Sequence, residues 1–160
     1  MPEDLQLSAV VRAIELAIAP VFLVTGVMAL LTLLTGRLSR VIDRARLLEG
    51  RLDEADPGEA VGDEAARWTE DLETLATRAS LINRALGLAT GAALMIGAVI
   101  AALFLGAFLG VQTQLFVGWM FIGAMALLIL ALVYFLREVF LATSRLQIGP
   151  FAAGRARGEP

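Results

Sequence analysis

The sequence predicts an all-α membrane protein with three transmembrane helices and a cytoplasmic antiparallel helical hairpin between spans one and two. Three observations lead to this prediction: two long uncharged stretches, a charged segment between them, and a heptad pattern within that segment. Hydrophobic residues make up 58% of the 160 residues, compared with about 45–50% in soluble domains. We expect four parts: residues 1–36, 37–85, 86–136 and 137–160.

The uncharged stretches are Leu16–Gly36 and Leu86–Leu136, and the second is 51 residues long. A bilayer core about 30 Å thick is crossed by about 20 apolar helical residues. The first stretch therefore predicts one span, and the second predicts two spans joined by a turn at residues 111–114. The N-terminal segment has neither the basic start nor the cleavage site of a signal peptide, so we expect it to remain as a span.

Pro20 leaves two arrangements open for the N-terminal segment. Proline removes one backbone donor and crowds the preceding turn of a helix. One arrangement is a single helix, kinked at Pro20, over about residues 6–36. The other is an interfacial helix followed by a short span from Pro20 to Gly36.

Apolar residues within the charged segment are spaced by three and four, as at the a and d positions of a heptad. Residues 55–62 between the two runs contain the Pro and Gly of a turn. We expect the runs to pack on each other as an antiparallel hairpin, with intermolecular coiled-coil pairing as the alternative. The apolar positions are Leu38, Val41, Ala45, Leu48 and Leu52, then Ala65, Trp68, Leu72, Leu75, Ala79, Ile82 and Leu86.

Arginine placement predicts the orientation of the spans. Basic residues flank the end of span one, the start of span two and the end of span three, whereas the turn at 111–114 has none. Basic flanks stay in the cytoplasm, so we expect the N-terminus outside and both the hairpin and the C-terminus inside. The flanking residues are Arg37, Arg40, Arg78, Arg84, Arg137 and Arg145. Nine acidic residues between Asp53 and Glu73 give the hairpin an acidic tip.

Charged residues at the inner membrane face form the main candidate functional cluster. Their simplest role is contact with anionic lipid headgroups, and the alternative is a vestibule for an ion or ligand. The cluster comprises Arg37, Arg40, Asp43, Arg44, Arg46, Arg84, Arg137 and Glu138. At the outer edge, Arg12 and Glu15 lie one helical turn apart, and we expect them to form an ion pair.

Small residues in span two predict close helix packing, within the chain or against a neighbouring subunit. These are Gly87, Gly91, Gly97, Gly106 and Gly110, together with intervening alanines. The chain contains no cysteine, histidine or lysine. The sequence therefore predicts neither a cofactor nor a metal, and it excludes thiol, imidazole and Schiff-base chemistry. A net charge of −3 argues against a nucleic-acid partner.

These features favour a non-enzymatic protein that self-associates through its spans as a scaffold or regulatory subunit. Its expected partners are membrane lipids, further copies of itself and a cytoplasmic or membrane protein. The alternative is a small homo-oligomeric ion channel with span one lining the pore through Thr25, Thr32 and Thr35. A membrane enzyme acting on lipid headgroups is a third hypothesis. It requires a polar cavity between Arg37, Arg40, Asp43, Asn83, Arg84 and Glu138.

Several runs along the chain match the sequence pattern of a known family. The matching residues are Ala19–Leu23, Gly26, Leu34–Leu38, Arg40, Asp43, Arg44, Arg46, Leu48, Glu49, Ile82–Ala85 and Phe135–Val139. In these runs the chain resembles a family of small bacterial membrane proteins, the domain of unknown function 2721. The resemblance covers about residues 8–148, and it implies a three-span protein of the bacterial inner membrane without an established activity. Thr32 departs from the family pattern, where an asparagine is expected.

Overall fold

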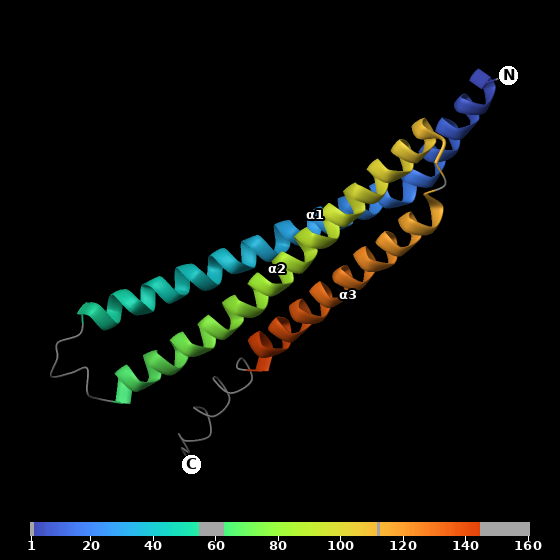
Figure 1. Cartoon of the computed structure of the whole chain (residues 1–160). Helices are drawn as coiled ribbons and strands as arrows, with labels where there is room; N and C mark the ends of the chain where they lie inside the picture. Colours follow the sequence, from blue (N-terminus) through green and yellow to red (C-terminus); the bar gives the residue numbers. More distant parts are fainter. Residues whose placement is uncertain (1, 55–62, 112, 145–160) are drawn as a thin grey trace, which may run out of the picture. The chain divides into compact units, whose positions relative to one another are not determined.

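The computed structural model describes residues 2–54, 63–111 and 113–144. This part of the chain forms three α-helices and contains no strand: α1 (Pro2–Glu54), α2 (Asp63–Leu109) and α3 (Gln114–Ser144) (Figure 1). All three helices are long and apolar enough to cross a membrane. The predicted helical class and the three candidate spans are therefore confirmed. The predicted turn at 55–62 and the tail from Arg145 lie outside the described residues.

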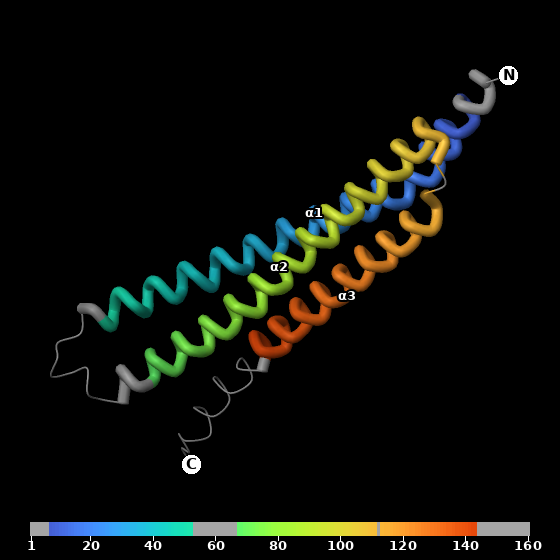
Figure 2. The backbone as a smooth tube through the Cα atoms, viewed as in Figure 1, coloured from blue at the N-terminus to red at the C-terminus, as the bar shows by residue number. Residues whose placement is uncertain are grey.

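Helix α1 continues through Pro20 as one element, which decides between the two arrangements that the sequence left open (Figure 2). Pro20 is itself buried, and Ala17 one turn earlier is buried as well. A proline withdraws one backbone donor from a helix. In an apolar surrounding every other backbone group still needs an internal partner, so continuing the helix leaves fewer groups unsatisfied than ending it would.

The chain divides into two compact units, and each helix contributes to both. We call residues 1–35 with 85–132 the apolar unit, and residues 36–84 with 133–160 the charged unit. The boundary at residue 36 coincides with the end of the first uncharged stretch. The division therefore separates the predicted spans from most of the charged residues.

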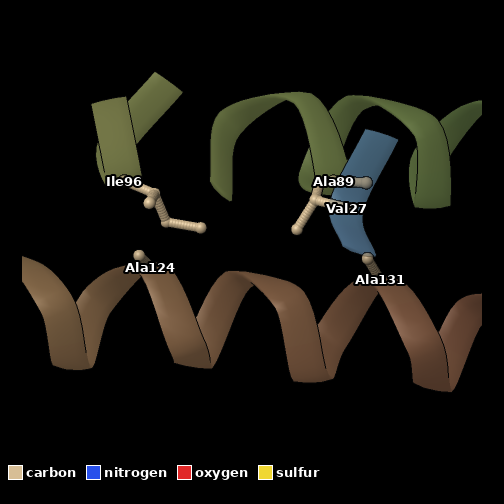
Figure 3. Close-up of a cluster of buried hydrophobic side chains, with 5 residues drawn as sticks. All are labelled: Val27, Ala89, Ile96, Ala124 and Ala131. Carbon is tan, nitrogen blue, oxygen red and sulfur yellow. The ribbon is translucent and has the colours of Figure 1, made fainter. Parts of the chain in front are cut away.

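The core of the apolar unit is built largely from alanines. Val27 of α1 is buried with Ala89 and Ile96 of α2 and with Ala124 and Ala131 of α3. Figure 3 shows Ile96 pointing toward Ala124 across the space between α2 and α3. Small side chains let helix backbones approach closely, and close packing is the main attraction between helices where lipid replaces water.

Buried positions follow a heptad spacing along each helix. This spacing is typical of helices that pack side by side over several turns. The fully or nearly buried residues are Ala13, Ala17, Pro20, Val27, Leu34 and Val41 in α1, Leu75, Ile82, Ala85, Ala89, Ala92, Ile96, Val99 and Gly106 in α2, and Val117, Ala124, Ala131 and Glu138 in α3. In the charged unit, every predicted heptad position whose exposure is described is buried or half-buried.

Two of the predicted packing glycines serve the turn after α2. Gly110 has a φ of 66°, which a glycine adopts without the cost of a side chain. The Val111 N–H donates to the Gly106 carbonyl at 3.2 Å, so α2 ends in a Schellman motif with Gly110 just past its last residue. A Cβ at Gly106 would collide with the Thr113 side chain. The structure thus gives Gly106 and Gly110 a role that differs from the expected helix packing.

The other three glycines divide into one packed and two open positions. A Cβ added at Gly91 would meet Leu127 of α3 at 3.7 Å, an ordinary contact. At Gly87 and Gly97 an added Cβ would meet nothing within 4 Å. The buried face of α2 is instead lined by Ala85, Ala89 and Ala92. Helical phase explains the difference, because the two open glycines lie on the face that α1 and α3 do not cover.

We expect Ala124→Leu to destabilise the helix packing by about 1–3 kcal/mol, because extra methylenes must be forced into a filled core. Ala126→Leu is the matched control, since Ala126 is exposed on the same helix. The free energy of unfolding is measured in mixed micelles with a denaturing detergent. Equal stabilities of the two variants would contradict the packing described for Ala124.

Candidate functional site

Glu138 is the one charged side chain that is fully buried among the described residues, with an exposed fraction of 0%. It lies seven residues after Ala131 and therefore continues the buried face of α3. A carboxylate withdrawn from water is stable only when its charge is paired and its oxygens accept hydrogen bonds. The buried face of α3 thus ends in a group that requires cationic partners.

Two arginines from the other helices supply these partners. Arg37 of α1 donates from Nη1 to Oε2 of Glu138. Arg78 of α2 donates to Oε1 from Nε at 3.2 Å and from Nη2 at 2.8 Å. Both carboxylate oxygens are therefore engaged, and no buried side-chain nitrogen or oxygen lacks a partner in the described part of the chain. We call Arg37, Arg78 and Glu138 the triad.

Heptad phase explains why these two arginines point inward. Arg37 lies between the buried residues Leu34 and Val41 of α1. Arg78 lies between the buried residues Leu75 and Ile82 of α2. Residues three or four positions apart share one face of a helix, so each arginine projects from the face that its helix buries.

The triad carries one net positive charge, because two guanidinium groups face one carboxylate. The Arg37 and Arg78 side chains keep exposed fractions of 32% and 25%. This partial exposure lowers the desolvation cost that burial imposes on charged groups. The Phe135 ring lies under Arg37, with 5.3 Å between the guanidinium carbon and the ring centroid, and adds a cation–π contact.

A pocket of about 320 Å³ lies beside the triad within the charged unit. Its lining is mostly cationic and comprises Arg37, Arg40, Val41, Arg44, Leu75 and Arg78. Arg40 donates from Nε to the Gly36 carbonyl of its own helix at 3.0 Å. Such a lining has hydrogen-bond donors in abundance and suits an anion, whereas a cation would be repelled.

The structure brings only part of the predicted cluster together. Arg37 and Glu138 form ion pairs, and Arg40 and Arg44 line the pocket. The remaining members are exposed and lie outside the pocket lining: Asp43, Arg46, Arg84 and Arg137. Asn83 is also exposed and does not line this pocket.

The outer-edge pair and the metal prediction concern other parts of the chain. Arg12 and Glu15 are both exposed on α1, and no ion pair joins them among the described residues. Both line a shallow surface hollow with their neighbours on the same helix. The described residues include no group of three or more acidic side chains placed to hold a metal ion.

Arg78 is the residue of the triad that the predicted cluster did not include. In the sequence analysis, Arg78 appears only as one of the basic residues that flank the spans and predict their orientation. Its position between Leu75 and Ile82 in the heptad run was the signal that it faces inward. Arg37 and Arg78 each lie among buried apolar residues of their helix, so they need a buried acidic partner. Glu138 is that partner, because it continues the row of buried residues in α3.

Comparison with known protein families gives a match over most of the chain. A family model described as "Protein of unknown function (DUF2721)" matches residues 17–148. This range contains all three triad residues and agrees with the resemblance seen in the sequence. No curated protein and no solved structure matches the chain.

We expect Glu138→Gln to lower the free energy of unfolding by about 3 kcal/mol, because it leaves two inward-facing arginines without a counter-charge. Glu49→Gln is the control, since Glu49 is an exposed glutamate of the charged unit. Unfolding is followed by circular dichroism in mixed micelles.

A second arm of this experiment identifies the cause of the loss. Adding Arg78→Met to Glu138→Gln removes one of the uncompensated cations, so the double variant should be more stable than the sum of the single losses predicts. Strict additivity would show that the triad residues act independently and would contradict the assignment.

Proposed function

The chain belongs to this family of unknown function, DUF2721, and we propose that it is a non-enzymatic membrane scaffold or regulatory subunit that self-associates through α2. It would reside in the bacterial inner membrane and hold a helical hairpin in the cytoplasm for a protein partner. Its three apolar helices are consistent with an integral, multi-pass membrane protein. The observation that carries the proposal is an exposed face of α2 on which four of five residues are small.

This face is the heptad stripe Gly87, Thr90, Leu94, Gly97 and Ala101, and all five residues are exposed. Four of the five are small, and Leu94 lies between them with an exposed fraction of 72%. Nothing lies within 4 Å of a Cβ built at either glycine. Small residues at helical spacing allow a second helix to approach closely in a bilayer. A second copy of α2 would approach closely at Gly87 and Gly97 and pack around Leu94.

The exposed face of α3 has the opposite character and suits lipid. It carries large apolar side chains, of which Leu115 is 80% exposed and Trp119 is 68% exposed. Bulky apolar side chains pack well against acyl chains but hold a second helix at a distance. The contrast between α2 and α3 therefore favours α2 as the helix that meets another subunit.

The charged halves of α1 and α2 supply the part that would meet a partner. Helix α1 continues after Gly36 to Glu54, which corresponds to about 27 Å at 1.5 Å per residue. The apolar side chains Val41 and Ala45 of α1 line a common groove with Leu72 and Ala76 of α2. This groove supports the hairpin in which the two halves pack on each other and turn their charged faces to the cytoplasm.

The proposed orientation places the N-terminus and the turn after α2 outside, and the charged unit inside. It rests on the arginines that flank all three spans, since positively charged flanks are retained in the cytoplasm. The turn at residues 111–114 carries no charge, as expected of a loop that is translocated across the membrane.

The orientation predicts the labelling of single cysteines in a chain that contains none of its own. We expect Gln114→Cys to react with a membrane-impermeant maleimide in intact spheroplasts and Arg51→Cys to react only in inverted vesicles. Both native residues are exposed in the structure. The reverse pattern would overturn the proposed orientation, and labelling after solubilisation controls for reactivity.

Self-association predicts that Gly97→Leu weakens the oligomer by about tenfold or more, because the added side chain separates the helices by an amount that costs about 1–3 kcal/mol. Ala126→Leu on the exposed face of α3 is the matched control and should leave association unchanged. The measurement is energy transfer between labelled copies in liposomes at several protein-to-lipid ratios. A wild type that stays monomeric at every ratio would eliminate the scaffold proposal.

The channel is the second candidate, and the threonines of α1 are the observation that favours it. Thr25, Thr32 and Thr35 are exposed, but their hydroxyls donate to carbonyls of their own helix at 3.3, 3.0 and 2.8 Å. Arg37 flanks the end of span one and would therefore lie at the inner mouth of such a pore, but it is engaged by Glu138. We therefore expect silent planar bilayers in the same reconstitution. A steady conductance whose ion selectivity changes with Arg40→Glu would contradict the scaffold proposal and support the channel.

A further inference from the structure

The pocket beside the triad combines an excess of positive charge with a buried apolar floor. Four of its six lining residues are arginines, and the other two, Val41 and Leu75, are almost completely buried. An apolar floor excludes water and strengthens electrostatic interactions at the pocket surface. All six residues belong to the charged unit, so the pocket is a feature of one compact body.

The triad leaves part of this charge uncompensated. Glu138 is the only carboxylate that forms an ion pair with a pocket arginine among the described residues, and both of its oxygens are already occupied by Arg37 and Arg78. Arg40 and Arg44 form no ion pair in the same part of the chain. The pocket therefore has four guanidinium groups against one carboxylate.

Three of the four arginines are also held in place before any ligand arrives. Glu138 fixes Arg37 and Arg78 through three hydrogen bonds. The Gly36 carbonyl orients Arg40, whose donation from Nε leaves both terminal nitrogens available. Arg44 follows Arg40 by one helical turn on the same face of α1. A site whose donors are positioned in advance loses less entropy on binding.

We propose that this pocket binds a phosphate group, either as free phosphate or as part of a lipid headgroup. Guanidinium groups present paired N–H donors whose geometry matches two phosphate oxygens, and two or more arginines together match the charge of a phosphate. A volume of about 320 Å³ admits a phosphate with a small polar substituent such as glycerol. The site is independent of self-association through α2, because it involves no residue of that exposed face.

The test uses the full-length protein and two probes that separate the sources of phosphate. Inorganic phosphate is titrated by calorimetry into protein held in phosphatidylcholine nanodiscs. Binding of phosphatidylglycerol is counted by native mass spectrometry of detergent-solubilised protein. The variant is Arg40→Gln with Arg44→Gln, which leaves the triad intact. The matched control is Arg46→Gln with Arg84→Gln, which removes the same charge from exposed residues outside the pocket.

We expect one or both probes to bind wild type, and the pocket variant to weaken binding by roughly tenfold or more, as the loss of charged hydrogen bonds predicts. The control should change binding by less than about twofold, because distant exposed charges are screened. Binding of inorganic phosphate assigns a soluble ligand, and binding of phosphatidylglycerol alone assigns a headgroup.

Two results would overturn the proposal. One is the failure of both probes to bind wild type. The other is an equal loss in the pocket variant and the control, which would mean that surface charge in general attracts the anion. Where the double variant fails to fold, Arg44→Gln alone carries the same expectation, since the Arg44 side chain forms no ion pair among the described residues.

Discussion

The charged unit depends on the neutralisation of one buried carboxylate. Glu138 has no access to water, so its charge must be met by cations from within the protein. The structure meets it with one arginine from α1 and one from α2. A single side chain of α3 thereby holds all three helices, and the positions of Arg37 and Arg78 are fixed by the same requirement.

The two units are stabilised by different kinds of interaction. In the apolar unit, alanines such as Ala89 and Ala124 allow close van der Waals packing, which tolerates small shifts of one helix along another. In the charged unit, the hydrogen bonds to Glu138 have definite donors and acceptors and do not tolerate such shifts. The triad thus specifies the register of the three helices within the charged unit. Register specification is the best attested use of buried polar groups in helical assemblies.

Much of the fold could be predicted from the sequence because it depends on local and periodic signals. The lengths of the uncharged stretches predicted the spans. In the charged halves, apolar residues spaced by three and four, such as Leu38 and Val41 in α1 and Leu72 and Leu75 in α2, predicted the buried faces. The continuity of α1 through Pro20 could not be predicted, because it depends on the burial of that residue. The roles of Gly106 and Gly110 could not be predicted either, because glycine occurs both where helices pack closely and where a helix ends in a turn.

The sequence predicted the region and the residue types of the candidate site, but not which residues form the triad. From the sequence we grouped the charged residues expected at the inner membrane face, including Arg37 and Glu138. Their spacing did not indicate which of them meet. To choose Arg78 rather than Arg84, one must know which face of α2 is buried. To pair Arg78 with Glu138, one must also know how α3 is positioned along α2. Spacing along one helix contains the first kind of information but not the second.

The order of the triad along the chain has a consequence for biosynthesis. Glu138 follows Arg37 by 101 residues and Arg78 by 60. At translation rates of about 5–20 residues per second, Arg78 waits roughly 3–12 s for its partner to be made. During this time α1 and α2 present two guanidinium groups on faces that the finished protein buries. Emergence of the last helix therefore converts a repelling pair of arginines into an attractive centre, and insertion of α3 becomes the step that completes the fold.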